Sequence, residues 1–181
     1  MKAAYNLAFY QSKVNTLMAI ALDTPGLWRR MACWVYEGIL LFGVVFLAGY
    51  LFGTLSQTRY ALDNRHALQG FLFVVLGIYF VWFWAHGQTL AMKTWNIRVV
   101  GRDGKKITQL RAFGRYVLSW LWFLPPLLGV APFHLPGGEI VVICLGWIAI
   151  WATLSRFHPQ QQFWHDAWAG TRLVTSAPLS R

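Results

Sequence analysis

The sequence predicts an all-α membrane protein: a bundle of about four transmembrane helices with a small cytoplasmic β-hairpin. Two observations predict this class. Hydrophobic residues make up 57% of the 181 residues and charged residues only 12%, whereas a soluble domain carries about 25% charged residues. The apolar residues are also gathered into four runs. A chain with so little polar surface is expected to have lipid as its main solvent.

The four apolar runs are the predicted spans, and they cover residues 33–53, 71–85, 117–131 and 140–154. A spanning helix needs about 20 apolar residues, and the first run alone meets this length unaided. The third and fourth runs are short and must include interfacial aromatic residues. The third run also contains Pro125 and Pro126, which lack backbone donors, so we expect its helix to kink or end there.

The positive charges predict the orientation of the bundle. With four spans, all of the sixteen Lys and Arg residues except Arg59 and Arg65 fall on one side of the membrane. The positive-inside rule makes that side cytoplasmic, so both termini are expected in the cytoplasm. The net charge of +10 therefore indicates a border along lipid headgroups. No nucleic-acid partner is predicted, because the chain has no soluble module with a basic face.

The loop between the second and third spans is the predicted site of the hairpin. Residues 96–100 are β-prone, residues 101–104 signal a turn, and residues 105–108 can return as a second strand. An Asp-Gly pair favours such a turn because glycine adopts positive φ without steric cost. Residues 172–175 could add a third strand. The alternative is a solvated basic loop that touches lipid headgroups.

Charged side chains at membrane depth mark the candidate site. Glu37 lies inside the first span, where a carboxylate costs at least about 2.5 kcal/mol and must be paired, protonated or hydrated. Arg30 precedes it by about two helical turns, so both side chains share one face, which must contact other protein. Downstream of the fourth span, Asp166 lies among aromatic and amide residues. We expect it to pair with Arg30 or with Arg115, tying the ends of the domain together.

Five motifs follow one another along the chain: WRRMA at 28–32 with Glu37, GQTLAMK at 87–93, IRVV at 97–100 with DG at 103–104, Arg115, and HDAWAGT at 165–171. In this order and spacing they resemble the RDD family of bacterial integral membrane proteins, over residues 24–175. The resemblance implies a multi-pass protein of the bacterial inner membrane. It also places the family's arginine at Arg30 and one of its two aspartates at Asp166. Glu37 stands at the other aspartate position, a departure that extends the carboxylate by one methylene.

We expect three parts in the chain: a loosely ordered cytoplasmic leader at 1–23, an RDD-like membrane domain at 24–176 and a C-terminal tail at 177–181. Translation could start at Met1 or at Met18.

The leading functional hypothesis is transport of a small cation or proton. Arg30, Glu37 and Asp166 would form a buried polar centre, with Arg115 and His165 as further binding or relay candidates. Because four spans enclose little space, a solute pathway would require a homo-oligomer. The alternative is a non-transporting accessory or assembly protein whose charge network is structural. We expect neither enzymatic activity nor a cofactor or bound metal.

Overall fold

The computed structural model describes residues 23–57, 64–133, 135–159 and 161–176. It is mostly helical, with four long apolar helices and a small antiparallel sheet, which confirms the predicted fold class. The predicted leader up to residue 22, the alternative start at Met18 and the tail at 177–181 lie outside the described residues. The elements are α2 Leu27–Ser56, α3 Arg65–Ala85, α4 Leu90–Thr94, β1 Ile97–Gly101, α5 Gln109–Ser119, η1 Trp120–Trp122, α6 Leu124–Val130, η2 Ala131–Phe133, α7 Gly137–Leu154, η3 Ser155–Phe157, α8 Trp164–Trp168 and β2 Thr171–Thr175.

All four membrane-spanning segments are longer than the apolar runs that predicted them. The segments Leu27–Ser56, Arg65–Thr94, Gln109–Phe133 and Gly137–Phe157 contain 30, 30, 25 and 21 residues. At about 1.5 Å per residue the shortest is about 31 Å long, which matches a hydrocarbon core of about 30 Å. The third and fourth segments reach this length by including residues that flank their short apolar runs, as expected. Their helices continue through flanking polar and aromatic residues that a search for apolar runs leaves out.

The third span is interrupted, as its proline pair predicts. Helix α5 continues as the 3₁₀ turn η1, and Phe123 then departs from helical geometry with φ −123°. Helix α6 begins at Leu124 with proline in its first turn. Proline is tolerated there because the first backbone N–H groups of a helix have no intrahelical acceptor. The break therefore falls just before the prolines.

The sheet joins two segments that are far apart in sequence. Strand β1 pairs with β2 in antiparallel register, with Ile97 opposite Thr175 and Gly101 opposite Thr171. The predicted return strand at 105–108 is not formed. The predicted turn does close, since the N–H of Gly101 donates to the carbonyl of Lys105 and Gly104 takes a φ of 76°. The chain then runs into α5, and on that edge of β1 the N–H of Val99 donates to the carbonyl of Gly87 instead.

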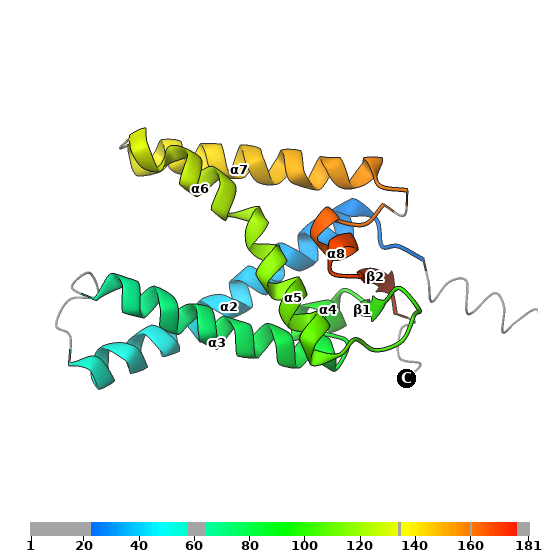
Figure 1. The fold of residues 1–181 in the computed structure, drawn as a ribbon, viewed down its shortest axis with the longest axis horizontal. Coiled ribbons are helices and arrows are strands. Elements are labelled where there is room, and N and C mark those ends of the chain that lie inside the picture. The colour runs from blue at the N-terminus through cyan, green and yellow to red at the C-terminus, as the bar shows by residue number, and fades with distance from the viewer. Residues whose placement is uncertain (1–22, 58–63, 134, 160, 177–181) are drawn as a thin grey trace, which may run out of the picture.

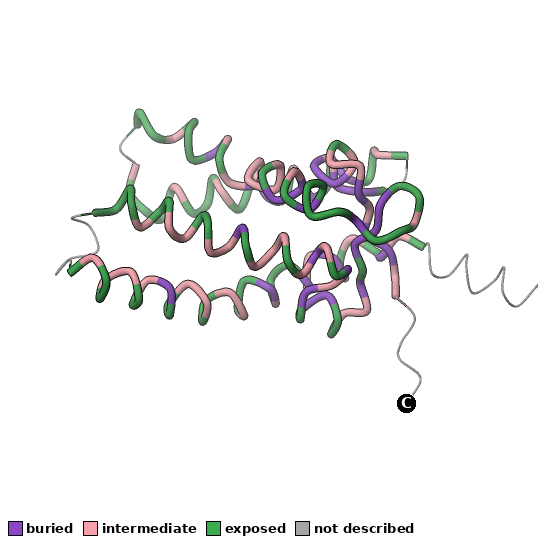
Figure 2. Tube along the Cα trace, turned by 60° about the horizontal axis from the view of Figure 1, so that its bottom comes forward, coloured by how far each residue is buried: buried purple, intermediate pink, exposed green. Residues whose placement is uncertain are grey.

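The elements form two helical hairpins and a compact end (Figure 1). Helices α2 and α3 make one pair, α6 and α7 make the other, and α5 packs on α3 between them. One end of the bundle holds the start of α2 together with the sheet, α4 and α8. The other end holds the end of α2, the start of α3 and the connection between α6 and α7. Buried residues concentrate at the end that holds the sheet (Figure 2), and the outer helical segments are largely exposed. That distribution fits helices that face lipid.

Candidate functional site

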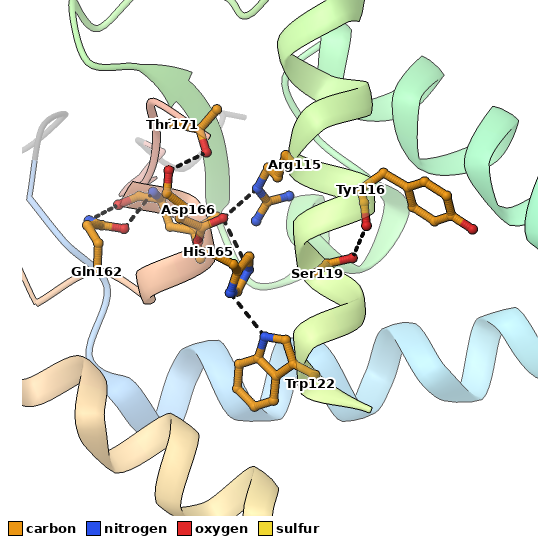
Figure 3. A network of polar contacts seen from close by, with 9 residues as sticks. Arg115, Tyr116, Ser119, Trp122, Gln162, His165, Asp166 and Thr171 are labelled. Atoms are coloured by element: carbon orange, nitrogen blue, oxygen red, sulfur yellow. Dashed lines mark hydrogen bonds and ion pairs between the residues drawn. The ribbon is translucent and has the colours of Figure 1, made fainter. Parts of the chain in front are cut away.

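A buried ion pair occupies the compact end of the bundle (Figure 3). Asp166, in α8, has no exposed surface, and its Oδ1 accepts a hydrogen bond of 2.6 Å from Nε of Arg115 in α5. The guanidinium of Arg115 also lies over the indole of Trp84, with its Cζ 4.0 Å from the ring centroid. Asp166 Oδ2 and Arg115 Nη1 have no hydrogen-bond partner among the described residues. The pair ties α8 to the third span.

His165 extends this pair toward the membrane helices. The indole N–H of Trp122 donates to His165 Nδ1 over 3.1 Å, and His165 Nε2 lies 3.3 Å from Asp166 Oδ1. An indole nitrogen can only donate, so Nδ1 is the acceptor and the proton of the neutral ring is on Nε2, facing the carboxylate. Burial lowers the pKa of His165 to about 4, although Asp166 acts in the opposite direction. The imidazole is therefore neutral at physiological pH.

The charge of Asp166 is set by its burial and by its neighbours. Burial raises the pKa of a carboxyl group, because it disfavours the charged form. Arg115 acts most strongly against burial, followed by His165 and then Arg30, and together they hold the pKa of Asp166 below its usual value. Asp166 is therefore ionised at neutral pH and bound to Arg115. In the Arg115–His165–Asp166 cluster, the arginine–carboxylate pair carries the charges.

Backbone contacts hold α8 in place beside this cluster. The side-chain amide of Gln162 donates to the carbonyl of Leu173 and accepts from its N–H, at 3.0 and 2.9 Å, as a neighbouring strand would. The same Gln162 nitrogen donates to Thr24 Oγ1, just before α2. The hydroxyl of Thr171 donates to the backbone carbonyl of Asp166. The segment after the fourth span thus folds back against the start of the first, as the sequence predicts.

Glu37 forms a second buried polar site, in the N-terminal half of α2. Its side chain is 6% exposed, and Oε1 accepts a 2.7 Å hydrogen bond from the hydroxyl of Tyr79 in α3. Oε2 accepts from the hydroxyl of Thr89, which in turn accepts from the backbone N–H of Met92 and so caps the start of α4. The φ of 100° at Gly87 permits the turn that returns the chain from α3 to Thr89. Neutral hydroxyl groups, not cations, hold this carboxylate.

Arg30 lies between the two sites and has no ion-pair partner among the described residues. It is 4% exposed, and its guanidinium carbon lies 4.4 Å above the ring centroid of Phe163. Its Nε and Nη1 find no hydrogen-bond acceptor in the described part of the chain. The predicted Arg30–Glu37 stripe is therefore buried but not paired. Of the two partners predicted for Asp166, Arg115 forms the ion pair.

A pocket of about 760 Å³ brings most of these residues onto one surface. Arg30, Glu37, Arg115 and His165 line it, together with apolar residues of α2, α3 and the α5–η1 segment. Glu37 is the one carboxylate among its described lining residues, and Asp166 is not part of the lining. No group of three or more His, Cys, Asp or Glu residues in the described ranges could hold a metal ion.

The structure adds residues that the sequence did not single out. Tyr79 and Thr89 supply the hydroxyl groups to Glu37, and Phe163 supplies the ring beneath Arg30. Trp84 and Trp122, aromatic residues of the second and third apolar runs, contact Arg115 and His165 directly. A threonine just before a short helix is a cap signal that could have drawn attention to Thr89. A lone tyrosine within an apolar run carries no comparable signal.

The model of the RDD family matches residues 24–170, which includes Arg30, Glu37, Arg115 and Asp166. No curated protein and no solved structure gives a significant match to the chain. With four segments long and apolar enough to span, the chain is a multi-pass membrane protein.

Proposed function

We propose that this protein, which belongs to the RDD family, moves a small cation or proton across a bacterial inner membrane. Glu37 would be the exchanging group, because it lies on the wall of a pocket among the membrane helices. That position is the observation on which the proposal rests. Asp166 is excluded from this role by its ion pair, which proton or cation binding would break.

The partners of Glu37 suit a carboxylate that changes its protonation state. A hydroxyl group donates and accepts hydrogen bonds, so Tyr79 and Thr89 can hold the ionised carboxylate and also accept from its protonated form. Neither partner carries a charge that binding of a cation would have to displace. A proton, or a small cation in its place, can therefore enter and leave without loss of the surrounding contacts.

The oligomeric state and orientation are parts of the same proposal. One chain encloses a pocket lined mostly by apolar side chains, so a continuous pathway would require a homo-oligomer. The distribution of Lys and Arg supports termini in the cytoplasm. If so, a membrane-impermeant thiol reagent labels Asp103→Cys in inverted vesicles and not in intact spheroplasts; the reverse pattern would contradict the orientation.

Ion flux in proteoliposomes tests the role of Glu37. Wild-type protein should dissipate an imposed gradient of protons, sodium or lithium, and Glu37→Gln should not. Glu37→Asp restores a carboxylate and should recover part of the flux, while Glu139→Gln, at an exposed carboxylate in the first turn of α7, should behave as wild type. Equal flux in Glu37→Gln and wild type, with both monodisperse, would refute the proposal.

A second candidate is an accessory or assembly protein without transport. The observation that favours it is the buried Arg115–Asp166 pair, which joins α5 to α8 and has a clear structural use. This candidate predicts no flux from any folded variant, and effects of Arg30 or Arg115 substitutions on stability and expression alone. Neither candidate assigns the chain an enzymatic reaction.

A further inference from the structure

The pocket has one polar end and one long apolar wall. Its lining along α2 runs from Arg30 to Phe42, about 18 Å at a rise of about 1.5 Å per residue. Leu76 and Phe80 of α3 and Trp120 of η1 line other parts of its wall. Its volume lies within the range of about 300–1,000 Å³ that is usual for organic ligands. A cation alone would leave this apolar length unused.

Arg30 supplies an anion receptor at the polar end. It lies one turn into α2, where a span beginning at Leu27 meets the headgroup region. The charge of Arg115 is matched by Asp166, and both oxygens of Glu37 are bonded to hydroxyl groups. Nε and Nη1 of Arg30 remain buried without a partner in the described residues. A buried donor that lacks an acceptor is costly, so a ligand oxygen here would be strongly favoured.

We infer that this pocket binds an anionic phospholipid of the surrounding bilayer, with its phosphate at Arg30 and one acyl chain along the apolar wall. The guanidinium fork matches phosphate oxygens, and one face of it is already covered by Phe163. The inference goes beyond ion exchange at Glu37 and does not depend on it. Bound lipid would complete the packing between α2 and the third span.

The apolar wall of the pocket forms a groove along α2, and the outer edge of this groove is open to the acyl-chain region of the bilayer. Val35, Ile39 and Phe42 line the pocket and are 54%, 65% and 74% exposed. Side chains with this exposure face lipid in a spanning helix, so a chain can enter sideways from the bilayer without crossing water. Gly38 lies among them, and a Cβ added there would meet no atom within 4 Å. The groove is therefore widened at the point where an acyl chain would pass.

Native mass spectrometry of the detergent-purified full chain tests the inference. Wild-type protein titrated with phosphatidylglycerol should retain one lipid in preference to phosphatidylcholine. Arg30→Gln should bind phosphatidylglycerol about tenfold more weakly, the loss expected for a hydrogen bond to a charged group. The matched control is Arg156→Gln, which removes an exposed charge near the same end of the bundle but outside the pocket. Equal affinity in the two variants would overturn the inference.

A second pair of variants keeps Arg30 and blocks the groove. Gly38→Phe fills the apolar wall and should also lose the lipid, whereas Gly43→Phe, on the same helix outside the pocket lining, should keep it. This pair decides the question if Arg30→Gln does not fold. Lipid retention by Gly38→Phe equal to that of Gly43→Phe would overturn the inference. Thermal stabilisation by inorganic phosphate equal to that by phosphatidylglycerol would also overturn it, because the site would then recognise a free anion.

Discussion

Two buried carboxylates of this protein are held in opposite ways. Asp166 lies at the compact end, with an arginine at 2.6 Å, a histidine at 3.3 Å and no exposed surface. Glu37 lies within a membrane helix, on a pocket wall, with hydroxyl groups as its partners. The Arg115–His165–Asp166 cluster therefore joins α8 to a helix about 50 residues earlier in the sequence, whereas the Glu37 site lines a space that a ligand can enter.

The difference indicates that the charge of its partners decides whether a buried carboxylate can change its protonation state. A carboxylate paired with arginine cannot be neutralised without leaving a buried charge unmatched, so Asp166 suits a fixed structural contact. A carboxylate held by neutral hydroxyl groups can change its charge and keep its contacts. Substitutions should therefore affect stability most at Asp166 and ion handling most at Glu37.

The largest expected effect comes from breaking the ion pair. Arg115→Gln leaves the Asp166 carboxylate buried without its partner and should lower the free energy of unfolding by about 3–5 kcal/mol. Denaturation of the detergent-solubilised protein, followed by circular dichroism, measures this change. Arg111→Gln, an exposed substitution on the same helix, should change stability by less than about 0.5 kcal/mol.

The double variant Arg115→Met/Asp166→Leu tests whether the stability lost in Arg115→Gln comes from the unmatched charge of Asp166. Replacing both charges with apolar groups removes the unmatched charge, so much of the lost stability should return. A double variant no more stable than Arg115→Gln would show that the cluster contributes more than charge matching. If Arg115→Gln is as stable as Arg111→Gln, the structural role assigned to the Arg115–Asp166 pair is contradicted.

A pH-dependent loss of stability should follow from His165. Its folded pKa of about 4 lies below its ordinary value, so the unfolded chain binds the proton first. Stability should therefore fall as pH drops from about 6.5 toward about 4, by up to about 3 kcal/mol. Asp166 adds no loss in this window, because a carboxyl group with a lowered pKa loses its stabilising effect only below its ordinary value of 3.8.

Thermal unfolding between pH 7 and pH 4 measures this effect. His165→Gln keeps an acceptor for Trp122 and a donor for Asp166 but does not titrate, so its melting temperature should fall less across the range. The exposed His86→Gln should retain the wild-type fall. A fall of the same size in His165→Gln would assign the pH dependence to other groups.

The smallest expected effect on stability is at Glu37. Glu37→Gln keeps the shape of the side chain and can still bond to Tyr79 and Thr89, so the loss should be about 1 kcal/mol. The same variant is expected to abolish flux, which separates function from folding at this site. Denaturation measured beside Arg115→Gln tests the order of the two effects. A larger loss in Glu37→Gln than in Arg115→Gln would reverse the comparison.

Much of the fold followed from local composition and much of the site did not. The spans, the break near Pro125 and the burial of Arg30 and Glu37 followed from apolar runs and from the cost of charge in lipid. The apolar runs are shorter than the helices that contain them, because helical hydrogen bonding continues past the last apolar residue. The strand at 172–175 was predicted as a third strand of the sheet, but its direct pairing with β1 was not, since strand partners depend on a contact between residues about 70 positions apart.

What the sequence alone determined was the environment: a chain too apolar for water, charges bordering its spans, and a few polar side chains that must avoid lipid. What only the tertiary structure decided was which groups those side chains meet. Arg115 rather than Arg30 pairs with Asp166, and Tyr79 and Thr89 hold Glu37. The physical reason is that transfer of a residue into lipid is a property of that residue, whereas a hydrogen bond requires two atoms within about 3 Å, a distance that helix packing sets.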